Sequence, residues 1–249
     1  MRQIIVQTLT NLGRYFDFVK DVILSVFRRP FRINQFVMEL EHLGVNSIAI
    51  IFLSGGAIGM IIALQMVALL LPFQAEIGTG AAVAVAMGRE LAPIITTLML
   101  IAKNGSAMAA ELGTMRVTEQ IDALESMAVS PVHYLVLPKV IASVVVFPVL
   151  TLLANVVGTL GSLFISVYLY GIDSAVYTHF MFDMLSPRDI YTGMIKSAIM
   201  GFMVATICCY KGLNTTQGAK GVGDSATSAV VTSSVAILVA DYILASLML

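Results

Sequence analysis

Two long stretches without a charged side chain constrain this sequence more than any other feature. They are residues 43–75 and 140–172, and each is longer than the roughly 20 apolar residues that a helix needs to cross a bilayer. Charged residues make up only 12% of the chain, against about 25% in a typical soluble domain. We therefore expect an all-α integral membrane protein, organised as a single transmembrane domain over residues 1–249.

Three further apolar stretches complete a prediction of five transmembrane helices. They are residues 80–103, 190–210 and 226–248, and they differ from the first two in containing isolated charges. If the N-terminus is cytoplasmic, most of the 14 Lys and Arg residues fall in segments on the cytoplasmic side. This is the side on which Lys and Arg are enriched in membrane proteins. The sequence thus predicts a multi-pass membrane protein with its N-terminus in the cytoplasm and its C-terminus on the other side of the membrane, which is the periplasm if this is an inner (cytoplasmic) membrane.

The segment 1–41, before the first predicted crossing, has the pattern of an amphipathic helix. Apolar residues recur at steps of three and four, with charged residues between them. These apolar residues are Ile5, Leu9, Leu12, Phe16, Val19, Ile23 and Phe27. We expect this helix to lie in the cytoplasmic membrane interface, with packing against a partner subunit as the alternative.

The loop of residues 111–130, between the second and third predicted crossings, is the most polar internal stretch. Charged and apolar residues alternate there, and the stretch ends at Ser130-Pro131. This pattern favours a short cytoplasmic coupling helix that docks in a groove of a soluble partner, with a solvated connector as the alternative. The predicted coupling residues are Glu111, Arg116, Glu119, Asp122, Leu124 and Met127.

The sequence contains no pattern that indicates catalysis. It lacks the Gly-rich loop ending in Gly-Lys-Ser/Thr that an ATPase needs, and its three histidines lie far apart. We expect a transport subunit rather than an enzyme, without a cofactor or metal of its own. The net charge of −1 and the absence of Trp give no indication of nucleic-acid binding.

Charged side chains within the predicted crossings are the candidate substrate site. Each costs roughly 2.5–3.5 kcal/mol on insertion scales, so such residues normally face a cavity or one another. The four charges are Arg89, Glu90, Lys196 and Asp241. We predict that they lie in the outer half of the membrane, where Arg89 and Lys196 bind a phosphate headgroup and the two carboxylates orient them. A mutually neutralising structural set is the alternative.

A stripe on the first predicted crossing is the candidate surface for acyl chains. Its residues recur at steps of three and four and include a single polar side chain; they are Ile62, Gln65, Leu69 and Phe73. Ordinary helix packing is the alternative interpretation.

Several motifs, in order along residues 40–249, resemble the MlaE/YrbE family of permeases. The matching segments are Gly88-Arg89-Glu90-Leu91-Ala92-Pro93, Gly105-Ser106-Ala107, residues 110–120, Gly221-Val222-Gly223 and Ala229-Val230-Val231. The run of residues 122–131 also looks like the coupling loop of ABC importer permeases. The chain departs from the family at Ser225-Ala226-Thr227-Ser228, where members often read Thr-Thr.

The resemblance implies a homodimeric permease of an ABC-type transporter, part of an MCE system. Such a permease moves phospholipid between the inner and outer membranes, which maintains lipid asymmetry, or between organelle membranes in plastids. The implied partners are a second copy of the chain, a cytoplasmic ABC ATPase that binds ATP and Mg, a periplasmic lipid-binding MCE-domain protein and a small STAS-domain protein. Two alternatives stay open: an ion-coupled secondary transporter of a lipid or amphiphile working through Glu90 or Asp241, and a membrane enzyme of lipid metabolism.

Overall fold

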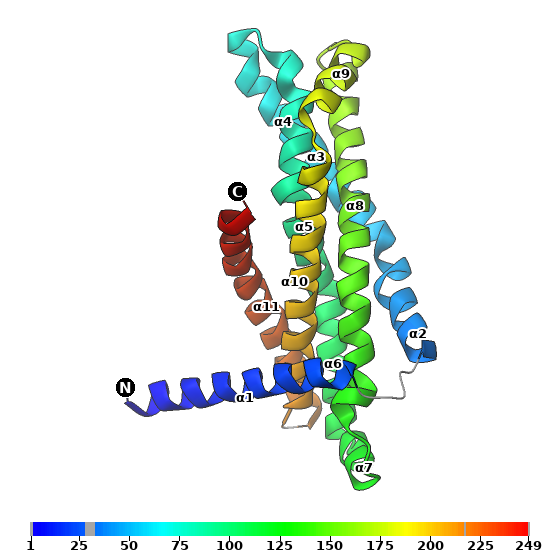
Figure 1. Ribbon diagram of the computed structural model, residues 1–249, viewed down its shortest axis with the longest axis vertical. Helices are drawn as coiled ribbons and strands as arrows, with labels where there is room; N and C mark the ends of the chain where they lie inside the picture. Colours follow the sequence, from blue (N-terminus) through cyan, green and yellow to red (C-terminus); the bar gives the residue numbers. More distant parts are fainter. Residues whose placement is uncertain (1, 28–32, 217, 249) are drawn as a thin grey trace. The chain divides into compact units, whose positions relative to one another are not determined.

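The structure is a computed structural model that describes residues 2–27, 33–216 and 218–248 (Figure 1). Helices account for nearly all of these residues, and no strand occurs among them, so the predicted all-α fold is confirmed. The α-helices are α1 (Arg2–Val26), α2 (Ile33–Leu43), α3 (Ile48–Leu70), α4 (Thr79–Ala86), α5 (Ala92–Leu100), α6 (Ser106–Val117), α7 (Gln120–Ser126), α8 (Leu137–Tyr168), α9 (Ser174–Met184), α10 (Pro187–Leu213) and α11 (Gly218–Met248). Short 3₁₀ turns are η1 (Val45–Ser47), η2 (Leu71–Phe73) and η3 (Glu76–Gly78), and π-helical turns are η4 (Met87–Leu91), η5 (Ile101–Gly105) and η6 (Val132–Val136).

Five helical stretches are long and apolar enough to cross a membrane, as predicted. They are Ile33–Phe73, Glu76–Val117, Val132–Tyr168, Pro187–Leu213 and Gly218–Met248. The boundaries differ from the predicted ones because the helices continue into polar flanks that hydropathy alone does not include. The third crossing ends at Tyr168 rather than at residue 172, since Gly171 adopts a left-handed conformation with φ of 68° that terminates the helix.

The predicted interfacial segment 1–41 consists of two helices rather than one. Helix α2 belongs to the first candidate crossing, so the interfacial assignment now concerns α1 alone, and residues 28–32 lie outside the described residues. The side chains of Ile5 and Leu9 also lie outside them. Of the remaining apolar stripe, four members are exposed: Leu12, Phe16, Ile23 and Phe27. This exposure is compatible with a helix whose apolar face contacts lipid.

The chain forms two compact units, and unit 1 comprises Met1–Leu40, Ile101–Ser143 and Phe202–Val235. Within it, α1 runs crosswise to α6 and packs against η6 (Figure 1). The Tyr15 hydroxyl lies 2.9 Å from the Thr206 hydroxyl of α10, and the Tyr15 ring packs edge-on against Tyr210. These contacts fix α1 through the side that carries Tyr15, Phe18 and the buried Val22, and leave the four stripe residues named above exposed.

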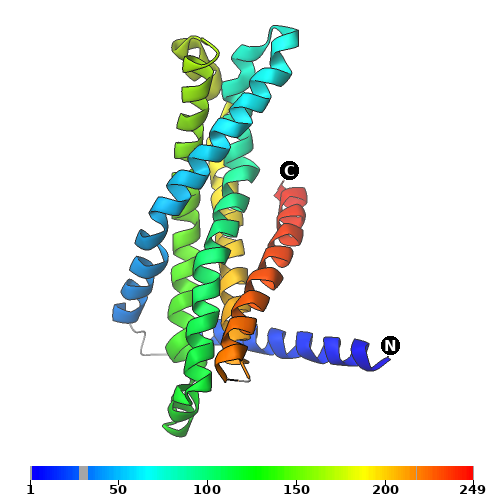
Figure 2. The ribbon, with the colours of Figure 1, turned by 180° about the vertical axis from the view of Figure 1, so that it is seen from behind.

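Unit 2 comprises Glu41–Leu100, Val144–Gly201 and Ala236–Leu249. Helix α3 crosses α8 at two small residues of each helix, and Figure 2 shows this crossing from behind. A Cβ atom built on Gly59 would overlap the backbone of Gly158, and one on Gly55 would touch Ala154. The small residues spaced four apart therefore permit backbone contact between these two helices, as such patterns do in lipid.

Helix α9 packs against α4 in unit 2 and is fixed by a buried tyrosine. The Tyr177 side chain is fully buried, its ring lies over Gly80, and its hydroxyl is 2.8 Å from the Ser162 hydroxyl of α8. Burial raises the pKa of the Tyr177 phenol, more than the hydrogen bond to Ser162 lowers it. The phenol therefore stays protonated at neutral pH and can donate to Ser162.

The N-terminus of α9 gives a first testable prediction. The Asp173 carboxylate accepts hydrogen bonds from the backbone N–H groups of Ala175 (2.7 Å) and Val176 (3.1 Å). Replacing Asp173 with Ala removes this N-cap, which typically stabilises by about 1 kcal/mol. We expect the unfolding midpoint in detergent to fall by about 2–4 °C. Asp173→Asn, which retains an acceptor oxygen, should change it little; an equal fall in both variants would contradict the capping role.

Candidate functional site

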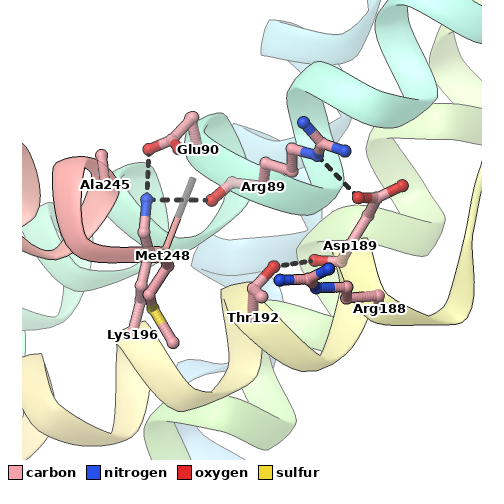
Figure 3. Close-up of a pocket in the computed structure, with 8 residues that line it drawn as sticks. All are labelled: Arg89, Glu90, Arg188, Asp189, Thr192, Lys196, Ala245 and Met248. Carbon is pink, nitrogen blue, oxygen red and sulfur yellow. Dashed lines mark hydrogen bonds and ion pairs between the residues drawn. The ribbon is translucent and has the colours of Figure 1, made fainter.

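The candidate site is formed by the predicted intramembrane charges, which the structure brings together in unit 2 (Figure 3). Lys196 of α10 is at the centre: its Nζ lies 2.5 Å from Glu90 Oε2 and 3.7 Å from Asp241 Oδ1 of α11. Arg89, the neighbour of Glu90 in η4, instead pairs with Asp189, with Nε 2.6 Å from Oδ1. All four predicted charges thus belong to one cluster.

The backbone of η4 explains why Lys196 lies where it does. Pro93 has no N–H, so the carbonyl of Arg89, four residues earlier, has no amide donor at the α-helical position. The Lys196 ammonium lies 3.4 Å from this carbonyl and donates to it. Arg89 lies within the π-helical turn η4, and such turns often occur at functional sites. Lys196 therefore satisfies a backbone group as well as a carboxylate.

A close helix contact holds α10 against this turn. A Cβ atom built on Gly193 would overlap the carbonyl oxygen of Gly88, so the two backbones approach directly at this pair of glycines. Lys196 is three residues further along α10 and on the same face as Gly193. The glycine contact thus brings the Lys196 side chain next to Arg89 and Glu90.

Asp189 is a member of the cluster that the sequence patterns did not select as a site residue. Its carboxylate accepts from the backbone N–H of Ser186 at 3.0 Å and from the Ser186 hydroxyl at 3.1 Å, in addition to Arg89. In the sequence, Asp189 lies at the edge of the predicted crossing of residues 190–210. Its pairing with Arg89 joins residues far apart in sequence, which local patterns do not reveal.

The cluster has a buried side and an exposed side. The side chains of Lys196 and Asp189 are only 2% and 4% exposed, whereas those of Glu90 and Arg89 are 43% and 50% exposed. They face a cavity of about 110 Å³, which is also lined by Arg188, Thr192, Ala245 and Met248 (Figure 3). This volume is well below that of typical ligand pockets, so it suits a headgroup fragment rather than a whole lipid.

The predicted acyl-chain stripe lies elsewhere. Its four residues are Ile62, Gln65, Leu69 and Phe73, and none of them lines the charged cavity. Leu69 and Phe73 are 61% and 76% exposed, and Gln65 is exposed as well. The stripe is therefore an exposed apolar surface on the first crossing.

The predicted coupling residues lie in unit 1, on two helices instead of one. Glu111 and Arg116 are on α6, which continues the second crossing, whereas Asp122 and Leu124 are on the separate α7. The helix divides because the residue before α7, Glu119, adopts a left-handed conformation with φ of 60°. Arg116 Nη1 lies 2.5 Å from Asp122 Oδ1, so an ion pair joins the two helices.

The apolar residues predicted for docking are accessible. Met127, directly after α7, is 71% exposed, and Leu124 is partly exposed. By contrast, Ile121 of the same helix is buried and anchors it to the protein. Helix α7 therefore presents apolar side chains outward without being detached from unit 1.

A second cluster of charges in unit 1 was not predicted at all. Lys139, near the start of α8, is 3% exposed, and its ammonium lies 2.6 Å from Glu39 Oε1 of α2 and 2.7 Å from Glu111 Oε2 of α6. From sequence, Lys139 is one of several basic residues in a predicted cytoplasmic loop, and Glu39 is part of an amphipathic pattern. Only the fold brings these residues together.

The fold and the charged cavity define a multi-pass all-α membrane protein with a polar site inside its membrane-spanning helices, an arrangement typical of transport proteins. Residues 36–247 match the model of the family described as Permease MlaE. The chain belongs to this MlaE permease family, which confirms the resemblance seen in its motifs.

Several curated relatives cover most of the chain. A probable ABC transporter permease protein of Rickettsia bellii is 36% identical over 95% of this chain and 92% of its own length. The intermembrane phospholipid transport system permease protein MlaE of Haemophilus influenzae is 36% identical over 85% of this chain and 82% of its own length. The chloroplastic protein TRIGALACTOSYLDIACYLGLYCEROL 1 of Arabidopsis thaliana is 39% identical over 90% of this chain and 64% of its own length. The Rickettsia bellii and Haemophilus influenzae relatives are both named as permease proteins, which agrees with the prediction of a transport subunit rather than an enzyme.

Proposed function

We propose that this chain is the membrane subunit of an ABC-type transporter that moves phospholipid between the inner and outer membranes. The observation that carries the proposal is the charged cavity of unit 2, where Arg89 and Glu90 are half exposed and their counter-charges are buried behind them. The exposed groups are the part of this network that a ligand in the cavity can contact. The name of the Haemophilus influenzae relative supports phospholipid as the substrate class.

In this proposal, the cavity binds the polar part of the lipid. Arg89 offers guanidinium N–H donors, since only its Nε is in the contact with Asp189, and such donors match the geometry of a phosphate. Lys196 was predicted from the sequence as a second phosphate donor, but its side chain is 2% exposed and its ammonium binds Glu90. In this proposal, Lys196 and Asp189 therefore hold Glu90 and Arg89 in place rather than contacting the lipid directly. Asp241 helps to position the Lys196 ammonium, which lies 3.7 Å from its carboxylate. The exposed stripe on the first crossing, from Ile62 to Phe73, is the proposed surface for the acyl chains.

The proposed energy source is a separate cytoplasmic ABC ATPase that binds ATP and Mg. It docks on the segment of residues 111–130, with the N-terminus of the chain on the same side of the membrane. The exposed Met127 and the partly exposed Leu124 suit the apolar groove of a partner, and Glu119 and Asp122 provide charge around them. The names of the relatives as ABC transporter permeases support this assignment.

A test of docking uses two apolar positions on the same segment. Replacing Leu124 and Met127 together with Asp should abolish co-purification of the ATPase, because two charges would enter an apolar groove. The permease itself should insert normally, since neither side chain is buried in unit 1. The control is Asp183→Asn on α9, an exposed position that is far in sequence from the docking segment. Recovery of the ATPase at wild-type stoichiometry with the double variant would contradict the docking assignment.

We further propose that two copies of the chain form the transporter, because five crossings are few to enclose a phospholipid. Helix α11 offers a face for such an assembly, since many of its large apolar side chains are exposed, among them Val231, Val235, Leu238 and Tyr242. A periplasmic MCE-domain protein and a small STAS-domain protein are the remaining proposed partners.

A further inference from the structure

The cluster around Lys139 joins three helices within unit 1. Glu39 is on α2, Glu111 is on α6 and Lys139 is on α8, so each charge comes from a different helix. The ammonium is almost fully buried and contacts one oxygen of each carboxylate. Hydrogen bonds between ionised groups are short, strong and directional, so the cluster fixes the three helices at one point.

The helices joined by this cluster lead to different parts of the chain. Helix α2 is the start of the first candidate crossing, and α8 is most of the third. Helix α6 ends at Val117 and is followed directly by α7, the proposed docking helix for the ATPase, to which it is tied by the Arg116–Asp122 ion pair. Lys139 therefore lies on a route of side-chain contacts from the docking helix, through α6, to these two crossings.

The two carboxylates are in different environments. The Glu39 side chain is 19% exposed, and its second oxygen is buried without a hydrogen-bond partner among the described residues. The Glu111 side chain is 44% exposed, and it lines a cavity of about 260 Å³ together with Met115 of α6. Lys139 and Glu39 line the same cavity, but their side chains are only 4% and 19% exposed. The α6 side of the cluster therefore has free space next to it, while the Lys139–Glu39 pair is mostly buried in the cavity wall.

We propose that Lys139 is a positioning residue that transmits movement of the docking segment to the first and third crossings. This inference rests on the proposed function, since it assumes that an ATPase moves α7. The cavity next to Glu111 allows α6 to shift, and the ion pair with Lys139 pulls α8 and, through Glu39, α2 along with it. A charged contact suits this purpose because the attraction between opposite charges persists over small displacements of α6.

The second contact between the first crossing and α8 fits this arrangement. In unit 2, Gly59 of α3 packs directly on Gly158 of α8, and Gly55 packs on Ala154. In unit 1, Glu39 of the same crossing is bound to Lys139 of the same helix. The first crossing and α8 are thus in contact within each of the two units.

The test separates loss of transmission from loss of folding. We compare the wild type, Lys139→Arg, the double variant Glu39→Gln/Lys139→Met, and the exposed control Asp183→Asn, each purified with the ATPase that co-purifies with the wild type. The double variant removes both buried charges together, a change that proteins often tolerate, and leaves the half-exposed Glu111 hydrated in its cavity. The measurements are the unfolding midpoint, ATP hydrolysis, and phospholipid transferred per ATP between proteoliposomes.

We expect the double variant to fold and to retain the ATPase. The amount of phospholipid transferred per ATP should fall by about tenfold or more, which corresponds to the free energy of one hydrogen bond to a charged group. Lys139→Arg should keep most of the coupling, because it preserves the charge. Unchanged transfer per ATP in the double variant would overturn the proposal, as would a parallel loss of folding and transfer in both variants. If the wild type itself transfers no phospholipid with ATP, the proposed function fails, and the inference fails with it.

Discussion

Replacing Arg89 with Gln should leave the protein folded and reduce phospholipid transfer by about tenfold or more, the effect of losing one hydrogen bond to a charged group. Glu90→Gln should also leave the protein folded and reduce transfer, because it removes the ion pair that holds Glu90 against Lys196 at the cavity. The fold should survive because the buried partners keep other contacts. Without Arg89, Asp189 still accepts from the backbone N–H and hydroxyl of Ser186. Without the Glu90 charge, Lys196 still lies 3.7 Å from Asp241 and donates to the carbonyl of Arg89.

Lys196→Met should behave differently from these two variants. Lys196 is 2% exposed, and its removal leaves Asp241 and Glu90 without their common cation. Breaking a buried pair in this way typically costs about 3–5 kcal/mol, so we expect low folded yield. The measurements are yield, unfolding midpoint and co-purified phospholipid by mass spectrometry. Normal lipid content and transfer in Arg89→Gln and Glu90→Gln, or collapse of both, would remove these residues from the proposed site.

The second large effect is expected at the crossing of α3 and α8. Gly59→Ala places a methyl group into the backbone of Gly158, which cannot be accommodated without moving a helix. Such overpacking costs about 1–3 kcal/mol and sometimes more, and we expect the upper end of this range. Gly158→Ala should cost less, because its Cβ would meet the flexible side chain of Met87 in addition to a more distant backbone atom of Gly55.

Gly223→Ala on α11 is the matched control, since a Cβ there has open space around it. Replacing a helical glycine with Ala should stabilise this variant by up to about 1 kcal/mol. The unfolding midpoint of each variant in the same detergent provides the comparison. Similar midpoints for Gly59→Ala and Gly223→Ala would show that the two helices do not depend on backbone contact at Gly59.

The parts of this structure that depend on local composition were predictable. The five crossings follow from apolar length, because a bilayer excludes nearly every other arrangement of such stretches. The clustering of Arg89, Glu90, Lys196 and Asp241 follows from the cost of a charge in lipid, which forces such residues to meet one another. Both arguments depend only on the low polarity of the lipid bilayer, and neither requires knowledge of the fold.

The pairing of individual residues was not predictable. Arg89 binds Asp189 rather than Asp241, and this choice depends on how closely α10 approaches η4 at Gly193 and Gly88. The Lys139 cluster depends on three helices that meet only in the folded chain. The division of the coupling segment at Glu119 likewise results from one left-handed residue, which a pattern of charged and apolar residues does not reveal.

ATP-driven phospholipid transfer is the measurement that tests the central claim most directly. The chain is reconstituted into proteoliposomes with its co-purifying ATPase, and movement of a labelled phospholipid to acceptor vesicles is followed with and without ATP. We predict transfer that requires ATP, that proceeds without an ion gradient, and that is lost in Arg89→Gln at normal ATPase binding. Transfer that needs an ion gradient instead of ATP, or equal transfer by wild type and Arg89→Gln, would contradict the account.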